Sequence, residues 1–410
     1  MIIKGIKERR EFPNNILWSA AFLTIVGLIV LRSISQHSDD GFFQNPFLKQ
    51  ILFLLPAVFL CLTVYYTPRF LIHKYAYNLY IFGIMIIILP FFGSPQAGTF
   101  RWLDLGLPFS VQPSEFAKIF TIIALARYLS DHNLKMKNFS SIIIPLLLGL
   151  APTVIILQQP DLGTAIIMLT PLLPMLYWAG SRFFHLFLLL APIFSMLTAF
   201  HNIAFSAWAS LLAMVIFFSR PTFILSILLF FGNIFLGLLS PALWNNFFTQ
   251  YQRNRILTLF NPDKDPLGAA YQIIQSKTAI GSGGLFGKGW GEGTQTHLKF
   301  LPVQESDFIL SVMGEELGFI AISSVLIVFG YLCVNILKYS YQSKDRFSSL
   351  AMIGCGTVFM SHVFVNTAMT VGLIPVKGLP FPFVSAGGSF LLTSYIMLGL
   401  ILKLSNNYAD

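Results

Sequence analysis

Charged residues are scarce in this chain: Asp, Glu, Lys and Arg make up 10% of its 410 residues, against roughly 25% in a soluble domain. Cysteine is scarce too. The three cysteines, Cys61, Cys333 and Cys355, all lie inside apolar runs, so nothing suggests a disulfide framework or a metal cluster. A P-loop is missing, because no Lys-Ser/Thr pair follows the Gly-rich run at 281–284. We therefore expect no ATP hydrolysis within this chain.

Apolar residues are in excess: they form 55% of the chain, and the mean hydropathy is +0.73. A transmembrane helix needs roughly 17 to 25 apolar residues. The candidate spans are Leu17–Ile34, Leu48–Tyr66, Tyr75–Phe92, Pro113–Leu129, Ser141–Leu157, Leu162–Ala179, Phe183–Phe200, Ala204–Ser219, Thr222–Leu243, Phe308–Leu337, Phe347–Val371 and Phe383–Leu404. The sequence therefore predicts an all-α polytopic membrane protein with about 12 transmembrane helices, forming a single integral membrane domain over residues 1–410.

Orientation follows from the positions of Lys and Arg, because cytoplasmic connections carry an excess of both. Most of those in the short connections fall on the side of the N-terminus. We therefore expect both termini to be cytoplasmic, with residues 1–13 as a short cytoplasmic tail. No small-residue cleavage site follows the first apolar run, which argues against a cleaved signal peptide. This asymmetry also accounts for the net charge of +9 without a nucleic-acid partner.

One long polar segment, residues 245–307, interrupts the apolar runs and is predicted to form a large extracytoplasmic loop. Loops longer than about 15 residues are usually functional or disordered. Tyr, Trp, Phe and Leu occur throughout this one, which favours function. Asp263-Lys264-Asp265 matches the D-x-D of sugar-nucleotide transferases, but a turn between prolines and glycine explains it better.

Ionisable groups at the membrane are functional candidates, because they are costly to keep there. Arg101-Trp102 is followed by Glu115 and Lys118, which are three residues apart and can pair on one helix face. Two interpretations stay open for this cluster. It is either part of a functional cavity, or an interfacial Trp anchor with a structural ion pair.

Four further carboxylates are singled out at or near the predicted spans. Asp161 precedes the sixth span and is interpreted first as a helix cap, with the lining of an outer cavity as the alternative. Asp307 stands directly before the span that begins at Phe308, at the mouth of any cavity that the spans enclose. A helix cap is the alternative for Asp307. Glu315 and Glu316 follow about 12 to 13 Å along that helix, so at least one must face inward and be neutral or paired.

A series of motifs extends along nearly the whole chain. They are Arg101-Trp102-Leu103, Gln112-Pro113-Ser114-Glu115, Gln159-Pro160-Asp161-Leu162-Gly163-Thr164, Asp265-Pro266-Leu267-Gly268, Gln275-Ser276, Gly281-Ser282-Gly283-Gly284, Gly287-Lys288-Gly289, Phe300-Leu301-Pro302, Asp307-Phe308-Ile309, Glu315-Glu316-Leu317-Gly318 and Pro380-Phe381-Pro382-Phe383-Val384-Ser385-Ala386-Gly387-Gly388-Ser389. In this order they resemble the RodA/FtsW family, the polytopic SEDS proteins (shape, elongation, division and sporulation). Gly293-Thr294-Gln295 is closer to the elongation member, RodA. Family members usually have ten spans, so the resemblance implies a core of ten with two additional spans within Phe183–Leu243.

The resemblance implies a peptidoglycan glycosyltransferase that polymerises lipid II on the outer face of the bacterial cytoplasmic membrane. It also implies a partner, a class B penicillin-binding protein, which is a single-span transpeptidase. The family's essential aspartate corresponds to Asp307 and its important tryptophan to Trp102. Two departures stand out: Glu305-Ser306 precedes Asp307 where the family usually has His-Thr, and Ala386 follows Ser385 where it has Tyr.

The implied reaction displaces undecaprenyl pyrophosphate from an α-linked donor by the 4-hydroxyl of an acceptor sugar, giving a β-1,4 bond in one inverting step. Such a step needs a base near the hydroxyl, here Asp307, and positive charge near the pyrophosphate. Candidates for that charge are Arg101, Lys118 and Lys277, or a divalent cation such as Mg or Mn. The matched motifs add further candidate substrate-binding residues: Trp102, Glu115, Gln159, Asp161, Ser276 and Glu316.

Two other classes of function stay open. Intramembrane Glu115, Lys118, Glu315 and Glu316 would suit a lipid II flippase, and a non-catalytic scaffold of the elongation machinery is the third class. The large outer loop, with a carboxylate at its end, favours the enzyme, because a transporter would not need it. Membrane lipids surround the chain in every case.

Overall fold

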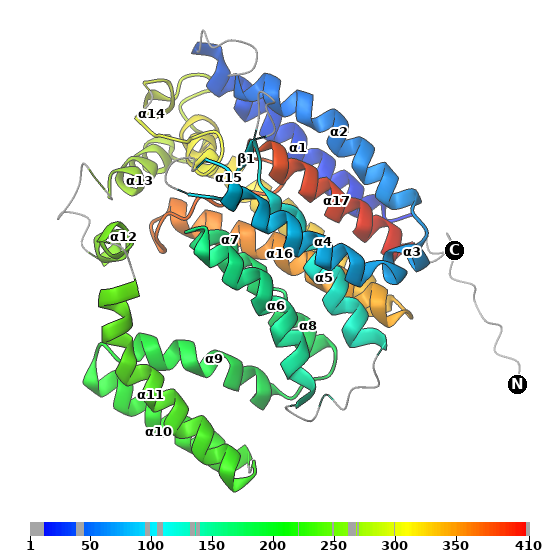
Figure 1. Cartoon of the computed structure of the whole chain (residues 1–410). Coiled ribbons are helices and arrows are strands. Elements are labelled where there is room, and N and C mark those ends of the chain that lie inside the picture. The colour runs from blue at the N-terminus through cyan, green and yellow to red at the C-terminus, as the bar shows by residue number, and fades with distance from the viewer. Residues whose placement is uncertain are drawn as a thin grey trace, which may run out of the picture. The chain divides into compact units, whose positions relative to one another are not determined.

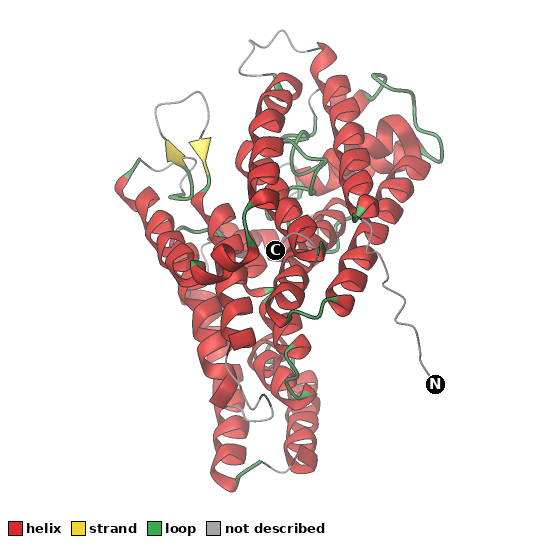
Figure 2. Ribbon diagram, turned by 90° about the vertical axis from the view of Figure 1, so that its right-hand side faces the viewer, coloured by secondary structure: helices red, strands yellow, loops and turns green. Residues whose placement is uncertain are grey.

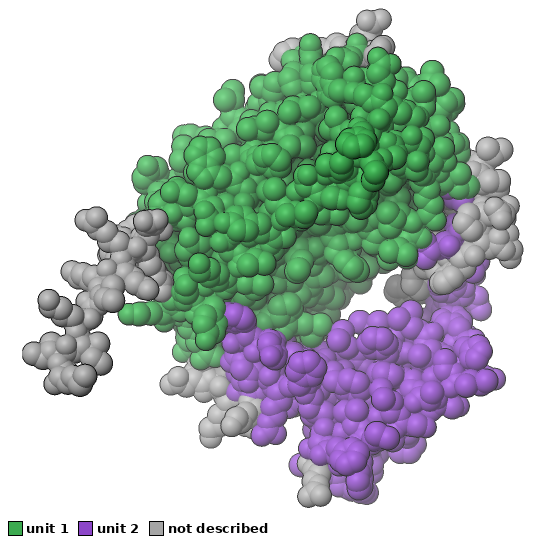
Figure 3. Space-filling view, turned by 180° about the vertical axis from the view of Figure 1, so that it is seen from behind, with its two compact units in different colours: residues 1–134, 143–175, 271–410 green, residues 135–142, 176–270 purple. Residues whose placement is uncertain are grey.

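The computed structural model describes residues 12–37, 45–94, 99–104, 110–131, 136, 140–219, 221–247, 250–260, 268, 270–298 and 300–406. The chain forms two compact units (Figure 3). Unit 1 comprises Met1–Leu134, Ile143–Met175 and Tyr271–Asp410, and unit 2 comprises Lys135–Ile142 and Leu176–Ala270. Among the described residues, strands are confined to one short hairpin and helices make up most of the rest (Figure 2).

The elements follow one another along the chain as Figure 1 labels them. The first half contains α1 (Asn14–Ile34), η1 (Ser35–His37), α2 (Pro46–Tyr66), α3 (Arg69–Lys74), α4 (Ala76–Ile88), η2 (Leu89–Phe92), β1 (Leu103–Asp104), β2 (Ser110–Val111), α5 (Pro113–Asp131), α6 (Ser140–Gln158), α7 (Leu162–Leu169) and α8 (Leu172–Trp178). The second half contains α9 (Phe183–Thr198), α10 (Asn202–Ser219), α11 (Phe223–Phe247), α12 (Gln250–Phe260), α13 (Tyr271–Gly283), α14 (Thr294–His297), α15 (Ile309–Gln342), α16 (Arg346–Thr370) and α17 (Gly388–Ser405).

Helices α16 and α17 form the centre of unit 1. In their apolar stretches 61% and 83% of the residues are buried, against 17% in α2, whose outer side is therefore available to lipid. α17 packs against α1, α2, α5, α15 and α16. Glycine makes this packing close, as small residues do between membrane helices: a Cβ on Gly399 of α17 would lie 2.4 Å from the carbonyl oxygen of Cys61 in α2.

Each of the twelve predicted spans contains a helix. Eight helices in the described part of the chain are long and apolar enough to cross a membrane, and Ala76–Phe92, Leu162–Trp178 and Phe183–Thr198 are shorter apolar helices. The chain is therefore an all-α polytopic membrane protein, with one small hairpin in its described part, while the count of about 12 crossings stays a prediction. The last helix, α17, begins at Gly388 and not at Phe383, because the residues before it form an irregular connection.

The segment 245–307, which is predicted to form a large extracytoplasmic loop, is partly helical. It contains α12, α13 and α14. The buried residues of α13 include Ile273, Ser276 and Ala279, a spacing that places them on one helix face. Polar residues on the other face hid this helix from a search for apolar runs. The D-x-D match at 263–265 lies outside the described residues, as does most of the tail at 1–13.

Helix α15 is interrupted at Gly318, where φ is +80°. Backbone N–H groups of residues 319 and 320 donate to the carbonyls of residues 284 and 285, and those of residues 288 and 289 donate to 315 and 316, at 2.9 to 3.2 Å. A Cβ on Gly287 would lie 2.1 Å from the carbonyl oxygen of Glu316. The glycine motifs at 281–289 and at 318 therefore serve this close backbone pairing.

In unit 2, hydrogen bonds join α9, α10 and α11, the segment predicted to contain two additional spans. The indole Nε1 of Trp208 in α10 donates to Ser195 Oγ of α9 at 2.8 Å, and Ser195 Oγ donates to Asn233 Oδ1 of α11 at 3.2 Å. Ala191, Leu212 and neighbouring apolar side chains pack around them. Polar contacts between membrane helices stabilise such packing modestly.

Candidate active site

The segment 371–387 between α16 and α17, here called the α16–α17 connection, is where several of the sequence motifs meet. Gln50 of α2 binds it twice: Nε2 donates to the carbonyl oxygen of Ser385 at 3.1 Å, and Oε1 accepts from the N–H of Gly387 at 3.3 Å. On α1, a Cβ at Gly27 would lie 2.5 Å from the carbonyl oxygen of Val384. The connection is thus fixed against two helices.

Asp307 lies in the turn before α15, and its side chain is half-buried. The N-cap position of α15 is Phe308, and Asp307 is the residue before it. Its Oδ1 accepts from Ser306 Oγ at 3.0 Å. Its Oδ2 lies 3.5 Å from the place that a Cβ on Gly378 would occupy, so glycine there leaves space beside the carboxylate.

Three successive carbonyls that end at Asp307 accept hydrogen bonds from α16 and the α16–α17 connection. The donors and distances are Ala386 N–H to Glu305 at 2.9 Å, Ser385 Oγ to Ser306 at 2.5 Å, and Asn366 Nδ2 to Asp307 at 3.0 Å. Glu305, Ser306 and Ala386, where the sequence departs from the family pattern, take part through backbone atoms. The departures therefore leave these contacts intact, and Ser385 is the residue of the connection that contributes a side chain.

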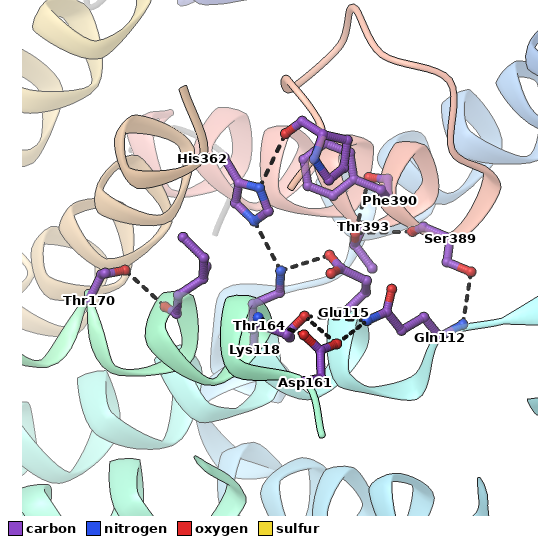
Figure 4. Close-up of polar contacts among 12 residues, drawn as sticks. Gln112, Glu115, Lys118, Asp161, Thr164, Thr170, His362, Ser389, Phe390 and Thr393 are labelled. Atoms are coloured by element: carbon purple, nitrogen blue, oxygen red, sulfur yellow. Dashed lines mark hydrogen bonds and ion pairs between the residues drawn. The ribbon is translucent and has the colours of Figure 1, made fainter. Parts of the chain in front are cut away.

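The predicted Glu115–Lys118 ion pair is present and buried, with relative exposures of 4% and 2% (Figure 4). Lys118 Nζ lies 2.8 Å from Glu115 Oε2 and 3.1 Å from Nε2 of His362 on α16. The other ring nitrogen of His362, Nδ1, lies 3.2 Å from the carbonyl oxygen of Pro380. Since a carbonyl can only accept, Nδ1 carries the proton and Nε2 is left to accept from the ammonium. His362 thus links the ion pair to the α16–α17 connection.

Asp161 caps α7, which confirms the first interpretation of this residue. Its Oδ1 accepts from the N–H of Thr164 at 3.0 Å, and its Oδ2 accepts from Thr164 Oγ1 at 2.8 Å and from Gln112 Nε2 at 3.1 Å (Figure 4). The backbone N–H of Gln112 donates to Ser389 Oγ at 3.0 Å. Through Gln112, the Asp161 cap is joined to the start of α17.

Two candidate substrate-binding residues make buried structural contacts. Gln159 Nε2 donates to the carbonyl oxygen of Ile87 at 2.6 Å. Ser276 Oγ of α13 donates to the carbonyl oxygen of Thr370 at 2.6 Å and lies 2.7 Å from Ser311 Oγ. Both residues are almost fully buried, so in this arrangement they fix helices and are not open to a ligand.

The three candidate cations differ in how far they are engaged. Lys118 is already neutralised by its ion pair. The guanidinium of Arg101 lies 5.8 Å from the centre of the Trp102 ring, within cation–π range, and its buried Nε has no hydrogen-bond partner in the described part of the chain. Lys277 is exposed, and its Cε lies 2.5 Å from where a Cβ on Gly372 would be, at the start of the α16–α17 connection. Arg101 and Lys277 are therefore the cations better suited to an anionic ligand.

Glu315 and Glu316 are both buried, and both are paired, which confirms the expectation for at least one of them. Glu315 accepts hydrogen bonds at 2.7 to 3.2 Å from Lys288 Nζ, the hydroxyls of Thr294 and Thr296 and the N–H groups of Gln295 and Thr296. Glu316 accepts from Ser33 Oγ at 2.6 Å and lies 3.2 Å from His297 Nε2. The two carboxylates hold residues 288–297 onto α15, and Glu316 is not grouped with the α16–α17 connection.

In the described residues, no group of three or more His, Cys, Asp or Glu side chains could hold a metal ion. A divalent cation beside the pyrophosphate therefore stays a prediction without a set of protein ligands in that part of the chain. The cysteines Cys61, Cys333 and Cys355 are free and buried, in agreement with their place in apolar runs.

Sequence reasoning missed His362 and Asn366, which link the candidate residues to the α16–α17 connection. The signal was available: both are polar residues in an apolar span, four positions apart, which places them on one helix face. The fold thus brings Asp307, the Glu115–Lys118 pair and Asp161 to one connection and the start of α17.

Comparison with known proteins finds similar sequences and a similar fold along nearly the whole chain. A family model described as "Cell cycle protein", FtsW/RodA/SpoVE, matches residues 14–211 and 207–409. The chain is 33% identical to peptidoglycan glycosyltransferase RodA of Treponema pallidum (strain Nichols), with 99% of each chain covered. It is 31% identical to the probable peptidoglycan glycosyltransferase FtsW of Trichlorobacter lovleyi, with 96% of this chain and 93% of the relative covered. One solved chain has the same fold. Its structure is described as "Structural coordination of polymerization and crosslinking by a peptidoglycan synthase complex". Its TM-score is 0.72 at 24% identity, and 98% of this chain and 100% of that chain are covered.

Proposed function

Because this chain belongs to the FtsW/RodA/SpoVE family and is a peptidoglycan glycosyltransferase, we propose that it polymerises lipid II and releases undecaprenyl pyrophosphate. The product is a β-1,4-linked glycan strand, made on the outer face of the cytoplasmic membrane, with both termini of the chain cytoplasmic. The likeness of Gly293-Thr294-Gln295 to RodA favours a role in cell elongation. Relatives named RodA and FtsW are almost equally similar, at 33% and 31% identity.

Asp307 is the proposed base, and its placement is the observation that carries the proposal. A general base must come within about 2.6 to 3.2 Å of the proton that it removes. The half-buried carboxylate stands on a turn whose carbonyls are held from α16 and the α16–α17 connection. In the proposed step, Asp307 takes the proton of the acceptor 4-hydroxyl, the oxygen bonds to the anomeric carbon, and the bond from that carbon to the pyrophosphate breaks.

Positive charge near the departing pyrophosphate is assigned to Arg101 and Lys277, with Trp102 beside Arg101. Charge placed where negative charge develops stabilises a transition state strongly. Neither cation would have to break a buried ion pair to bind an anion, whereas Lys118 would. The Glu115–Lys118 pair is assigned a supporting role through His362.

A class B penicillin-binding protein is the proposed partner. The solved chain with a TM-score of 0.72 is described in the context of a peptidoglycan synthase complex, which supports this choice. A lipid II flippase draws less support from the structure, because Glu115, Glu315 and Glu316 are all buried in fixed contacts.

Purified protein in detergent, given labelled lipid II with and without the transpeptidase, tests the proposal. Without an intact bilayer, polymer can come only from an enzyme and not from a flippase. We expect Asp307→Asn and Asp307→Ala both to lose about 10²-fold or more in rate, at an unchanged melting temperature, because the N-cap position of α15 is Phe308.

The matched control is Asp161→Asn. An asparagine there keeps an oxygen for the N–H of Thr164 and caps a helix about as well as aspartate, so activity should be retained. An Asp307→Asn protein that polymerises lipid II at near wild-type rate would remove the assignment of Asp307 as the base.

A further inference from the structure

Asn366 of α16 joins three separate segments of unit 1 with one side chain. Its Nδ2 donates to the carbonyl oxygen of Asp307 at 3.0 Å and to that of Leu379 at 2.7 Å. Both N–H bonds of the amide are therefore used. The residue is completely buried, so water does not replace either contact at the surface. One amide thus fixes α16, the turn before α15 and the α16–α17 connection to one another.

The main chain at Asp307 is more tightly defined than an ordinary turn. The hydroxyl of Ser385 donates to the carbonyl of Ser306 at 2.5 Å and accepts from the N–H of Phe381 at 2.9 Å. The N–H of Asp307 itself donates to the carbonyl of Val303 at 3.1 Å. With the contact from Asn366, the peptide groups on both sides of the Asp307 Cα are held, and so is the direction of its Cα–Cβ bond.

We propose that Asn366 is a positioning residue that sets the direction of the Asp307 carboxylate toward the acceptor hydroxyl. This inference rests on the proposed function of Asp307 as the base. A misplacement of about 1 Å by a change away from the reacting atoms can cost about 10²-fold in rate. Loss of the Asn366 amide frees the Asp307 carbonyl and allows the turn to rotate, which misplaces the carboxylate but leaves it present and able to bind a proton.

If Asn366 had only a structural role, Asn366→Ala would lower the melting temperature without a specific loss of kcat. Asn335 provides a matched control. Asn335 of α15 is also a buried amide in an apolar span, with 6% exposure, and its Nδ2 donates to the carbonyl oxygen of Tyr331 at 2.8 Å within its own helix. Asn335→Ala removes a buried amide but no contact to Asp307. It therefore reports what the loss of a membrane-buried asparagine does by itself.

The experiment compares Asn366→Ala, Asn335→Ala and Ser385→Ala in the full chain, each purified in detergent and assayed for kcat, KM and melting temperature with lipid II. We expect Asn366→Ala to lower kcat by about 10- to 100-fold with KM within about twofold of wild type. Asn335→Ala should keep its kcat at a comparable loss of melting temperature. Ser385→Ala, which loses one of the other contacts to the turn, should lower kcat in the same way and carries the test if Asn366→Ala does not fold.

A kcat of Asn366→Ala or of Ser385→Ala equal to that of Asn335→Ala would overturn the inference, as would a change confined to KM. The proposed function is tested separately, by Asp307→Asn assayed in the same experiment. An inactive Asp307→Asn with a fully active Asn366→Ala rejects only the positioning role. An active Asp307→Asn rejects the base itself.

Discussion

Replacement of Lys118 tests whether its ion pair with Glu115 is structural or functional. In Lys118→Met, the carboxylate of Glu115 keeps its 4% exposure but loses its cation. Removal of one partner of a buried pair costs about 3 to 5 kcal/mol of stability. His362 Nε2 also loses its donor, and an unsatisfied buried acceptor costs about 1 to 3 kcal/mol. We therefore expect a clear fall in the melting temperature of the purified protein and loss of polymerisation.

The double variant Glu115→Leu with Lys118→Met is the informative comparison. Apolar replacement of a whole buried pair is often neutral or stabilising by about 1 to 4 kcal/mol, which offsets the cost at His362. The melting temperature should return close to the wild-type value while polymerisation stays lost, if the pair serves the active site. A double variant as unstable as Lys118→Met would refute the electrostatic reasoning. A stable and fully active double variant would show that the pair only fills the core.

Four further predictions concern topology, partner and fold. A reporter fused after Asp265 should be exported and one after Arg346 should stay cytoplasmic, and a cytoplasmic signal at Asp265 would contradict the proposed side of the reaction. A single-span penicillin-binding protein should co-purify with the chain from membranes and raise its polymerisation rate, and full activity of the isolated chain with no gain would count against it. Glu315→Gln should lower the melting temperature, because a charge-assisted hydrogen bond contributes about 1.5 to 3 kcal/mol. An unchanged melting temperature would mean that the contacts of Glu315 do not hold residues 288–297. Gly287→Ala should prevent folding, since φ is +82° and its Cβ would lie 2.1 Å from a carbonyl oxygen, whereas Gly330→Ala, with nothing within 4 Å, should be tolerated.

Hydropathy located the apolar helices well, since each of the twelve predicted spans contains a helix. The same signal failed within residues 245–307, where α13 buries one face and leaves the other polar. It also placed the start of the last span at Phe383, although the backbone there has φ +66° and belongs to the α16–α17 connection. Apolar composition reports burial, and Phe383 and Val384 are buried without belonging to a helix.

The candidate site was only partly predictable, for a reason that lies in the backbone. The Glu115–Lys118 pair follows from helical spacing, and it is present as expected. The contacts that hold Asp307 run largely through carbonyls, which every residue carries and no sequence pattern marks. His362 and Asn366 gave a signal as polar residues in an apolar span, but their targets lie in irregular segments whose path the sequence does not define.

A structural carboxylate and one that can act as a base differ in which of their atoms the protein holds, the side chain or the main chain. Glu315 is attached through its carboxylate, which accepts five hydrogen bonds at 2.7 to 3.2 Å, so a proton on it would weaken the contact that holds residues 288–297. A base must gain and lose a proton in every turnover. The turn at Asp307 is held from α16 and the α16–α17 connection by main-chain carbonyls, so protonation of its carboxylate leaves those hydrogen bonds in place. Asp307 can therefore change charge during the reaction without releasing the turn that positions it.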